Sequence, residues 1–309
     1  MDHWDVAHKP IPAPRYAAQR KNAILQGYFV NHFAWRSSLS NNAASFVGDI
    51  PSHYDSGLGP NIFDDYADLI VQQCQAHSPQ SVVELAAGTG IVSKRLRDAL
   101  PQETRLVVTD LNGPMLDIAK TKFADTDNVE FMVANAMDLP FAESEFDLMT
   151  CQFGVMFFPD KPVSYREAAR VLKPGGRYIF NVWGAMASNP FARLANEVTA
   201  SFFPTDPPGF YKVPFHYHDP LVVKADLAAA GWSQVAHNTI RLTKTVADPQ
   251  AFATALVFGN PLIDEIRARG GVEPDDVVAA MLESMHSEFG QGQFEMPLVA
   301  TTYICEVSK

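Results

Sequence analysis

A regular alternation of strand-like and helix-like segments between Asn61 and Trp183 constrains the fold of this chain more than any other feature. Short runs of apolar and β-branched residues predict strands at residues 81–86, 106–110, 129–133, 146–153 and 177–183. Apolar residues at helical spacing predict helices at residues 61–70, 91–100, 114–123 and 161–172, the first of them capped by Asn61. Strands that alternate with helices form a parallel sheet covered on both faces, and right-handed crossovers make it doubly wound. The predicted fold class is therefore α/β and Rossmann-like.

The same pattern divides the chain into three regions. Residues 1–59 are interpreted as an N-terminal helical extension or cap, residues 60–184 as the core, and residues 185–309 as a lid insertion followed by the completion of the sheet. A proline-rich and aromatic loop at residues 204–220 is the predicted lid. The segments after it predict a strand at 233–243, two or three helices at 249–288 and a last strand at 298–308. Aromatic residues of the extension could either cover the site or form the contact of a homo-oligomer, namely Phe29, Phe33 and Trp35.

Composition argues against several classes of function. The 35 acidic residues outnumber the 24 basic ones and give a formal net charge of −11, which argues against nucleic acid as a partner. No apolar run reaches the roughly 18 residues of a membrane span, and the polar start lacks the pattern of a secretory signal. The three cysteines lie far apart, as is usual in a reducing compartment, so we expect a cytoplasmic protein. Neither the cysteines nor Asp206, His216 and His218 show the regular spacing of metal ligands, so no metal is expected.

The first strand-to-helix turn is the predicted ligand site, because ligands of open parallel sheets bind beyond the carboxyl ends of the strands. This turn runs from Glu84 to Gly90, and Gly88 and Gly90 allow the backbone to bend sharply and to approach a ligand closely. The second strand ends at Asp110, whose carboxylate can accept both hydroxyls of a ribose. Together these features predict a cofactor that contains a nucleoside.

The residues of the turn favour S-adenosylmethionine over a dinucleotide. A dinucleotide fingerprint needs a third glycine at the position of Ser93. A carboxylate at Glu84 that faced the ligand would repel a pyrophosphate and attract a sulfonium or ammonium group. A nucleotide-dependent oxidoreductase is the alternative that these two residues disfavour.

Four segments resemble the successive motifs of class I S-adenosylmethionine-dependent methyltransferases, and in particular the ubiquinone and menaquinone biosynthesis subgroup. They read VVELAAGTG, VVTDLNGPML, NAMDLPFAESEFDLM and AARVLKPGGRYIFNVW, and the resemblance extends from about Tyr54 to Trp183. It implies a mostly parallel sheet of seven strands. It also implies a set of cofactor-binding residues, namely Tyr54, Glu84, Ala86, Gly88, Gly90, Asp110, Leu111, Met115, Asn135, Ala136, Met137 and Gln152. The chain departs from the family where Ala86 replaces a glycine and Asn135 replaces an aspartate.

Aromatic residues near the expected mouth of the site predict a small, apolar or aromatic acceptor. Those expected to bind it are Phe153, Phe157, Tyr211 and Phe215. Methyl transfer to O, N or C is an in-line displacement that depends largely on positioning, so a general base is optional. The candidates for a catalytic group are His216, in the lid, and Tyr54. Two alternatives remain at this point, a catalytically silent regulator that binds the adenosyl cofactor and a methyltransferase of macromolecules.

Overall fold

The computed structural model of this chain describes residues 43–308, and the description below is confined to them. Most of the predicted N-terminal extension, with Phe29, Phe33 and Trp35, lies outside these residues. No helix within residues 43–308 is both long enough and apolar enough to cross a membrane.

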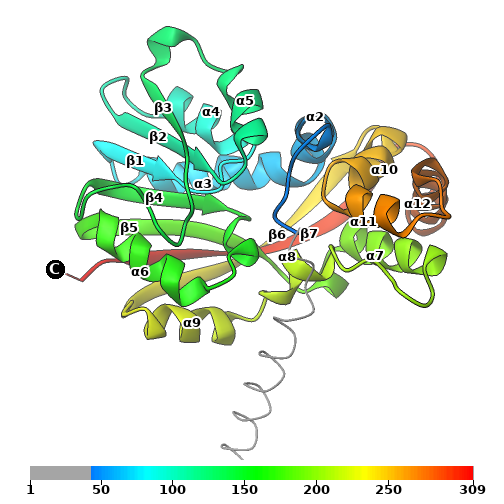
Figure 1. Cartoon of the computed structure of the whole chain (residues 1–309). Helices are drawn as coiled ribbons and strands as arrows, with labels where there is room; N and C mark the ends of the chain where they lie inside the picture. Colours follow the sequence, from blue (N-terminus) through cyan, green and yellow to red (C-terminus); the bar gives the residue numbers. More distant parts are fainter. Residues whose placement is uncertain (1–42, 309) are drawn as a thin grey trace, which may run out of the picture. The chain divides into compact units, whose positions relative to one another are not determined.

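A seven-stranded sheet in the order β3-β2-β1-β4-β5-β7-β6 forms the core, which confirms the predicted α/β fold class (Figure 1). The first five strands are mutually parallel, whereas β7 runs antiparallel to both β5 and β6. Their bounds are β1 Ser81–Glu84, β2 Arg105–Asp110, β3 Val129–Val133, β4 Phe146–Gln152, β5 Leu172–Trp183, β6 Gln234–Val246 and β7 Phe294–Glu306. Every residue of β1 is buried, as is typical of a strand covered on both faces.

Helices cover both faces of the sheet, and Figure 1 shows α6 and α9 on the side opposite α3 and α4. The helices that alternate with the strands are α3 Asp64–Gln75, α4 Ile91–Ala99, α5 Gly113–Lys120, α6 Lys161–Val171 and α9 Pro220–Ala229. Short 3₁₀ turns lie at Asp125–Asp127, Val155–Phe157 and Met186–Ser188. The predicted turn at KPGG is instead part of β5, which starts at Leu172 and is irregular where the register with β4 shifts after Phe146.

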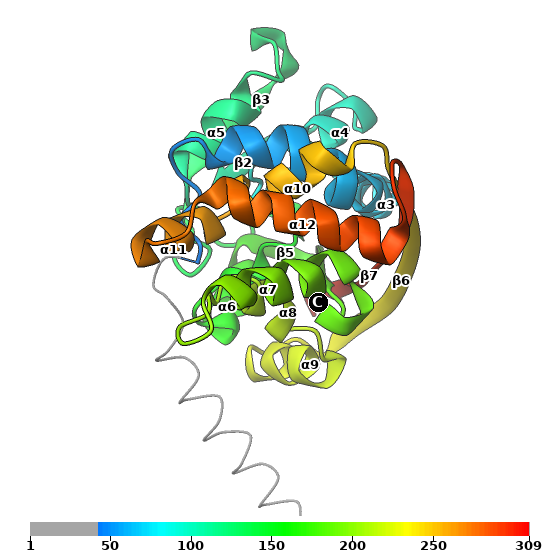
Figure 2. The same ribbon diagram turned by 90° about the vertical axis from the view of Figure 1, so that its right-hand side faces the viewer.

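A second group of helices packs beside the sheet (Figure 2). It comprises α7 Pro190–Phe202, α10 Pro249–Phe258, α11 Leu262–Arg269 and α12 Pro274–Phe289. The last three connect β6 to β7, so the prediction of two or three helices there is confirmed. The predicted lid loop contains a short helix, α8 Lys212–His216, because Val213 and Phe215 are buried and fold this segment onto the core.

The segment before the core differs from the prediction. A short helix, α2 Ile50–His53, leads into a π-helix at Tyr54–Phe63, labelled η1, which continues into α3. Asn61 is therefore inside a helix and is not an N-cap, and its Nδ2 donates to the carbonyl of Gly57 at 2.7 Å. Gly57 packs so closely on Ala255 of α10 that a Cβ atom there would overlap the side chain of Ala255.

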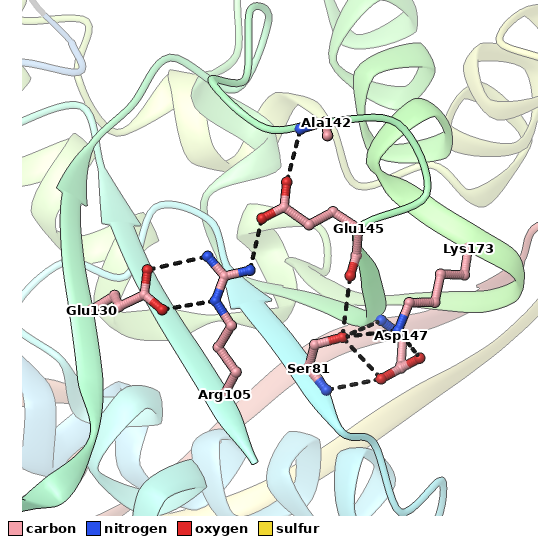
Figure 3. Close-up of polar contacts among 7 residues, drawn as sticks. All are labelled: Ser81, Arg105, Glu130, Ala142, Glu145, Asp147 and Lys173. Carbon is pink, nitrogen blue, oxygen red and sulfur yellow. Dashed lines mark hydrogen bonds and ion pairs between the residues drawn. The ribbon is translucent and has the colours of Figure 1, made fainter. Parts of the chain in front are cut away.

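A polar network stabilises the amino ends of the central strands, at the edge of the sheet opposite the predicted site (Figure 3). Arg105 donates to both carboxylate oxygens of Glu130, at 2.7 and 3.1 Å, and to Glu145 at 2.7 Å. Asp147 accepts from the backbone and hydroxyl groups of Ser81 and pairs with Lys173. These bonds link β1 to β4 and β2 to β3, which fixes the register of the strands whose other ends form the site.

Candidate functional site

A largely apolar cavity of about 100 Å³ lies beyond the carboxyl ends of the central strands. It is lined from several elements, by Phe46, Tyr54, Leu58, Ile62, Phe63, Ala86, Gly88, Asp110, Asn112, Met115, Gln152, Phe153, Gly154, Met156, Phe157, Trp183, Phe191, Phe210, Tyr211, Pro214, Phe215, Leu256 and Asn260. Its position agrees with the rule for open α/β sheets. The cavity brings together half of the predicted cofactor residues and all four predicted acceptor residues.

Asp110 holds the predicted ligand turn. Its Oδ2 accepts from the backbone N–H of Gly88 at 2.8 Å, and its Oδ1 accepts from the backbone N–H of Asn112 at 2.7 Å. Burial raises the pKa of Asp110, while the hydrogen bonds from Asn112 and Gly88 oppose that rise. The carboxylate and the turn are thus placed next to each other at one end of the cavity.

Glu84 occupies a different place from the one inferred from its charge. Only 1% of it is exposed, it does not line the cavity, and its Oε2 accepts from the hydroxyl of Ser93 at 2.5 Å. Burial raises the pKa of Glu84 to about 8, so the group is mostly protonated at neutral pH. The structure therefore places the Glu84 side chain outside the cavity lining, and its expected attraction to a sulfonium stays a prediction. Ser93, read from the sequence only as a missing glycine, is its hydrogen-bond partner.

The remaining predicted cofactor residues lie outside the cavity lining. Gly90 precedes α4 and packs on Ala119. Leu111 is 57% exposed at the end of β2, and Asn135 is exposed after β3, with its Oδ1 accepting from the N–H of Met137 at 3.0 Å. Ala136 and Met137 follow it. Since Asp110 of β2 pairs with Val133 of β3, this group lies beside the Asp110 end of the cavity, and its role in binding the adenine stays a prediction.

The other end of the cavity is aromatic. Phe153 stacks on Trp183 with ring centroids 3.9 Å apart and an angle of 7° between the planes, and Trp183 stacks on Phe215 at 5.8 Å. Phe157 stacks on Phe210 at 6.2 Å. Phe153 also has a φ of +52°, a strained conformation that is found most often at functional sites.

The two predicted catalytic residues have different positions. Tyr54 lines the cavity and stacks on Phe63 at 4.9 Å. Burial, with smaller contributions from Asp110, Asp55 and Glu84, raises the pKa of Tyr54 far above its ordinary value, so its hydroxyl stays protonated. His216, in contrast, is exposed at the end of α8 and does not line the cavity, although Phe215 before it does. The structure therefore does not bring His216 to the site.

Sequence reasoning missed several residues of the cavity. Phe46 lies over it, with ring contacts to Tyr54, Phe157 and Phe210 at 5.9 to 6.4 Å. Asn112 fixes this segment, because its Oδ1 accepts from the N–H of Phe46 and its Nδ2 donates to the carbonyl of Ala44. No local sequence signal marks Phe46, which precedes the motifs. Within residues 43–308, no group of three or more His, Cys, Asp or Glu side chains could hold a metal ion.

Comparison with known families gives a match for the core. Residues 51–198 match the model of the ubiE/COQ5 methyltransferase family. The ubiquinone/menaquinone biosynthesis C-methyltransferase UbiE of Hahella chejuensis is 35% identical over 121 residues, which cover 38% of this chain and 48% of that protein. The protein of the same name from Shewanella frigidimarina is 29% identical over 160 residues, 48% of this chain and 63% of the relative. The chain thus spans about half the length of the curated relatives it matches.

Solved structures share the fold at low sequence identity. The YcgJ protein from Bacillus subtilis superposes with a TM-score of 0.53 at 18% identity and covers 79% of this chain and 99% of that chain. A phosphoethanolamine N-methyltransferase 2 from Haemonchus contortus, solved with phosphomonomethylethanolamine and S-adenosylhomocysteine, gives 0.55 at 13% identity, with 87% and 60% covered. These likenesses show the architecture alone.

Proposed function

We propose that this chain, whose residues 51–198 match the model of the ubiE/COQ5 methyltransferase family, is a class I S-adenosylmethionine-dependent methyltransferase that transfers a methyl group to a small apolar or aromatic molecule. The observation that supports this most strongly is a single cavity with two unlike ends. One end presents the Asp110 carboxylate and the Gly88 turn, and the other is walled by stacked aromatic rings.

The residues at the polar end fit the cofactor of the family. Asp110 is buried and its two oxygens lie at the mouth of the β1–α4 turn, where they would accept the hydroxyls of a ribose. Ala86 and Gly88 form the wall that would face the methionine part, with Tyr54 across from Gly88. When bound, S-adenosylmethionine supplies an electrophilic methyl group on its sulfonium. The protein's part is to hold the acceptor in line and to exclude water.

Part of the acceptor side of the cavity lies outside the match to the family model. Phe210, Tyr211, Phe215, Leu256 and Asn260 all lie beyond residue 198, where the match to the family model ends. The acceptor of the UbiE relatives is therefore not carried over to this protein. The stacked rings favour an apolar or aromatic body of limited size, because sites for small molecules are mostly lined by apolar and aromatic side chains.

Calorimetric titration of the full chain with S-adenosylmethionine, S-adenosylhomocysteine and NADH tests the proposal. We expect both adenosyl compounds to bind and NADH not to bind. Asp110→Asn should weaken the binding of S-adenosylmethionine at least about tenfold, the loss of one or two charge-assisted hydrogen bonds. Asp117→Asn, at an exposed residue of α5, is the matched control and should bind as the wild type does.

Transfer of an isotope-labelled methyl group to acceptors then separates an enzyme from a silent regulator of the same fold. A protein that binds the adenosyl compounds but labels no acceptor supports the regulator. Binding of the dinucleotide alone would overturn the proposal.

A further inference from the structure

Gln152 lines the cavity and has a buried hydrogen-bond acceptor without a partner among residues 43–308. It is the last residue of β4 and lines the cavity between the turn that bears Ala86 and the aromatic wall. Its Nε2 donates to the carbonyl of Phe63 at 3.2 Å, which fixes the orientation of the amide. Its Oε1 is buried and has no hydrogen-bond partner among residues 43–308. Because a buried acceptor without a donor is unfavourable, this atom points to a donor on a bound molecule.

The carbonyl that holds this amide belongs to a cluster of aromatic residues. Phe63, whose carbonyl holds Gln152, lies 5.7 Å from Phe153 and 6.2 Å from Trp183 between ring centroids, and Phe153 and Trp183 are stacked on each other. Packed rings of this kind exclude water. The site therefore favours an acceptor group that enters neutral over one that enters charged, because burial of a charge in apolar surroundings is costly.

The titratable groups that line the cavity, within the part of the chain that the structure describes, are Asp110, Tyr54 and Tyr211. Asp110 already accepts hydrogen bonds from Gly88 and Asn112. The hydroxyl of Tyr211 donates to the carbonyl of Leu256 at 2.8 Å. Burial raises the pKa of both tyrosines, so neither is an effective base. An acceptor that must first lose a proton, such as a hydroxyl or an acidic carbon, is therefore poorly served by this lining.

We propose that the acceptor is a neutral amine on an apolar or aromatic body, that Oε1 of Gln152 receives one of its N–H groups, and that its nitrogen is methylated. This inference rests on the proposed function. The nitrogen lone pair forms the new N–C bond as the S–C bond breaks, and the electron pair of that bond stays on sulfur. The product is a methylated ammonium, which releases its proton to water. Gln152 is thereby a catalytic residue that orients the lone pair toward the methyl group.

Matched acceptors test the nature of the nucleophile. The full chain is incubated with S-adenosylmethionine and with phenylalkyl compounds of one skeleton that carry an amine, a hydroxyl or a thiol, and with a phenol, and products are identified by mass spectrometry. We expect that only the amine is methylated, or that it is methylated at least a hundredfold faster than the hydroxyl compounds. For two amines of different pKa, the midpoint of the rise of kcat/KM with pH should move with the amine.

Gln152→Met tests the role of the amide, because methionine keeps the volume and removes the acceptor. We expect at least a tenfold loss of kcat/KM for the amine and a matching loss of its binding in the presence of S-adenosylhomocysteine, measured by calorimetry. In this proposal Gln152 serves the acceptor and not the cofactor to which the family resemblance assigns it, so the affinity for S-adenosylhomocysteine alone should change less than about threefold. Gln250→Met, at an exposed residue of α10, is the control and should behave as the wild type does.

Two results would overturn the inference while the proposed function survives. They are methylation of hydroxyl or carbon acceptors without the amines, or no methylated amine from a protein that binds S-adenosylmethionine. Unchanged binding and turnover of the amine by Gln152→Met would also overturn it. Failure to bind the adenosyl compounds would instead remove the proposed function.

Discussion

Gly154 packs directly against Ala86, so closely that a Cβ atom on Gly154 would overlap the side chain of Ala86 and lie 2.7 Å from Sγ of Cys151. Ala86 has a φ of +49°, in the left-handed region that favours glycine. Ala86 thus carries a methyl group on one side of this contact, and Gly154 carries no side chain on the other. The departure from the family pattern at Ala86 is accommodated by the loop after β4.

Gly154→Ala should therefore destabilise the protein by about 1 to 3 kcal/mol, the usual cost of an extra methyl group in a packed core. It should also weaken the binding of S-adenosylmethionine, because Ala86 belongs to the turn. Ala86→Gly in the Gly154→Ala background should restore part of both losses, although Cys151 still crowds the new methyl group. Urea unfolding and calorimetry of the two single variants and the double variant measure the coupling. Strict additivity would show that the two residues do not influence each other.

Glu84 should make the protein less stable as the pH rises. With a folded-state pKa of about 8, this group keeps its proton while the same group in the unfolded chain loses it, so the free energy of unfolding falls between about pH 4.5 and pH 8. The loss should total about 5 kcal/mol, at about 1.36 kcal/mol for each pKa unit between the two states. Glu84→Gln should remove this pH dependence. The free energy of unfolding of the variant, relative to that of the wild type, should therefore rise with pH across that range. Urea unfolding at several pH values measures this difference, and Glu143→Gln, at an exposed residue, is the control. The same pH dependence of the free energy of unfolding in Glu84→Gln and in the wild type would contradict the prediction.

Phe46 should control the exchange of ligand. The cavity of about 100 Å³ is smaller than the roughly 300 to 1,000 Å³ of ordinary ligand sites, and Phe46 contacts three of its aromatic residues. Each ring contact is worth about 0.5 to 1.5 kcal/mol, so Phe46→Ala should speed the dissociation of S-adenosylmethionine about tenfold or more. Stopped-flow fluorescence measures this rate, and Val47→Ala, at an exposed neighbour, is the control. An unchanged rate in Phe46→Ala would show that ligands leave by another route.

Asp147→Asn should affect stability without affecting the site. Although burial alone would raise the pKa of Asp147, its interactions with Lys173 and Ser81 lower it below its ordinary value. Loss of the carboxylate at the amino edge of the sheet should cost about 1 to 2 kcal/mol in urea unfolding, since the group is partly exposed. Calorimetry should give the wild-type affinity for S-adenosylmethionine. A large loss of affinity would mean that the two edges of the sheet are coupled.

The core and one end of the site could be predicted from the sequence because their signals are local. Alternating strands and helices determine the sheet, and the turn from Glu84 to Gly90 followed by Asp110 marks the place of the ligand. The direction in which a side chain points cannot be read from the local sequence alone. The position of the Glu84 side chain, for example, depends on Ser93 in the next helix.

The aromatic end depends on contacts between residues far apart in sequence. Phe46 and Asn260 reach the cavity from segments that carry no motif. Asn260, after α10, donates to the hydroxyl of Tyr211, before α8, at 3.2 Å across 49 positions of the sequence. His216 was expected at the site from its residue type, yet the burial of Phe215 in α8 leaves the adjacent His216 exposed.

The contact between Gly57 and Ala255 has a kinetic consequence. Gly259, after α10, also approaches the backbone of Tyr54, where a Cβ atom would lie 3.1 Å from the Tyr54 nitrogen. Two helices in such close contact cannot separate without exposing both of these surfaces. We therefore expect η1 and α10 to move together as one rigid unit. The opening of the cavity then depends on lining segments other than these two helices, such as the segment that carries Phe46.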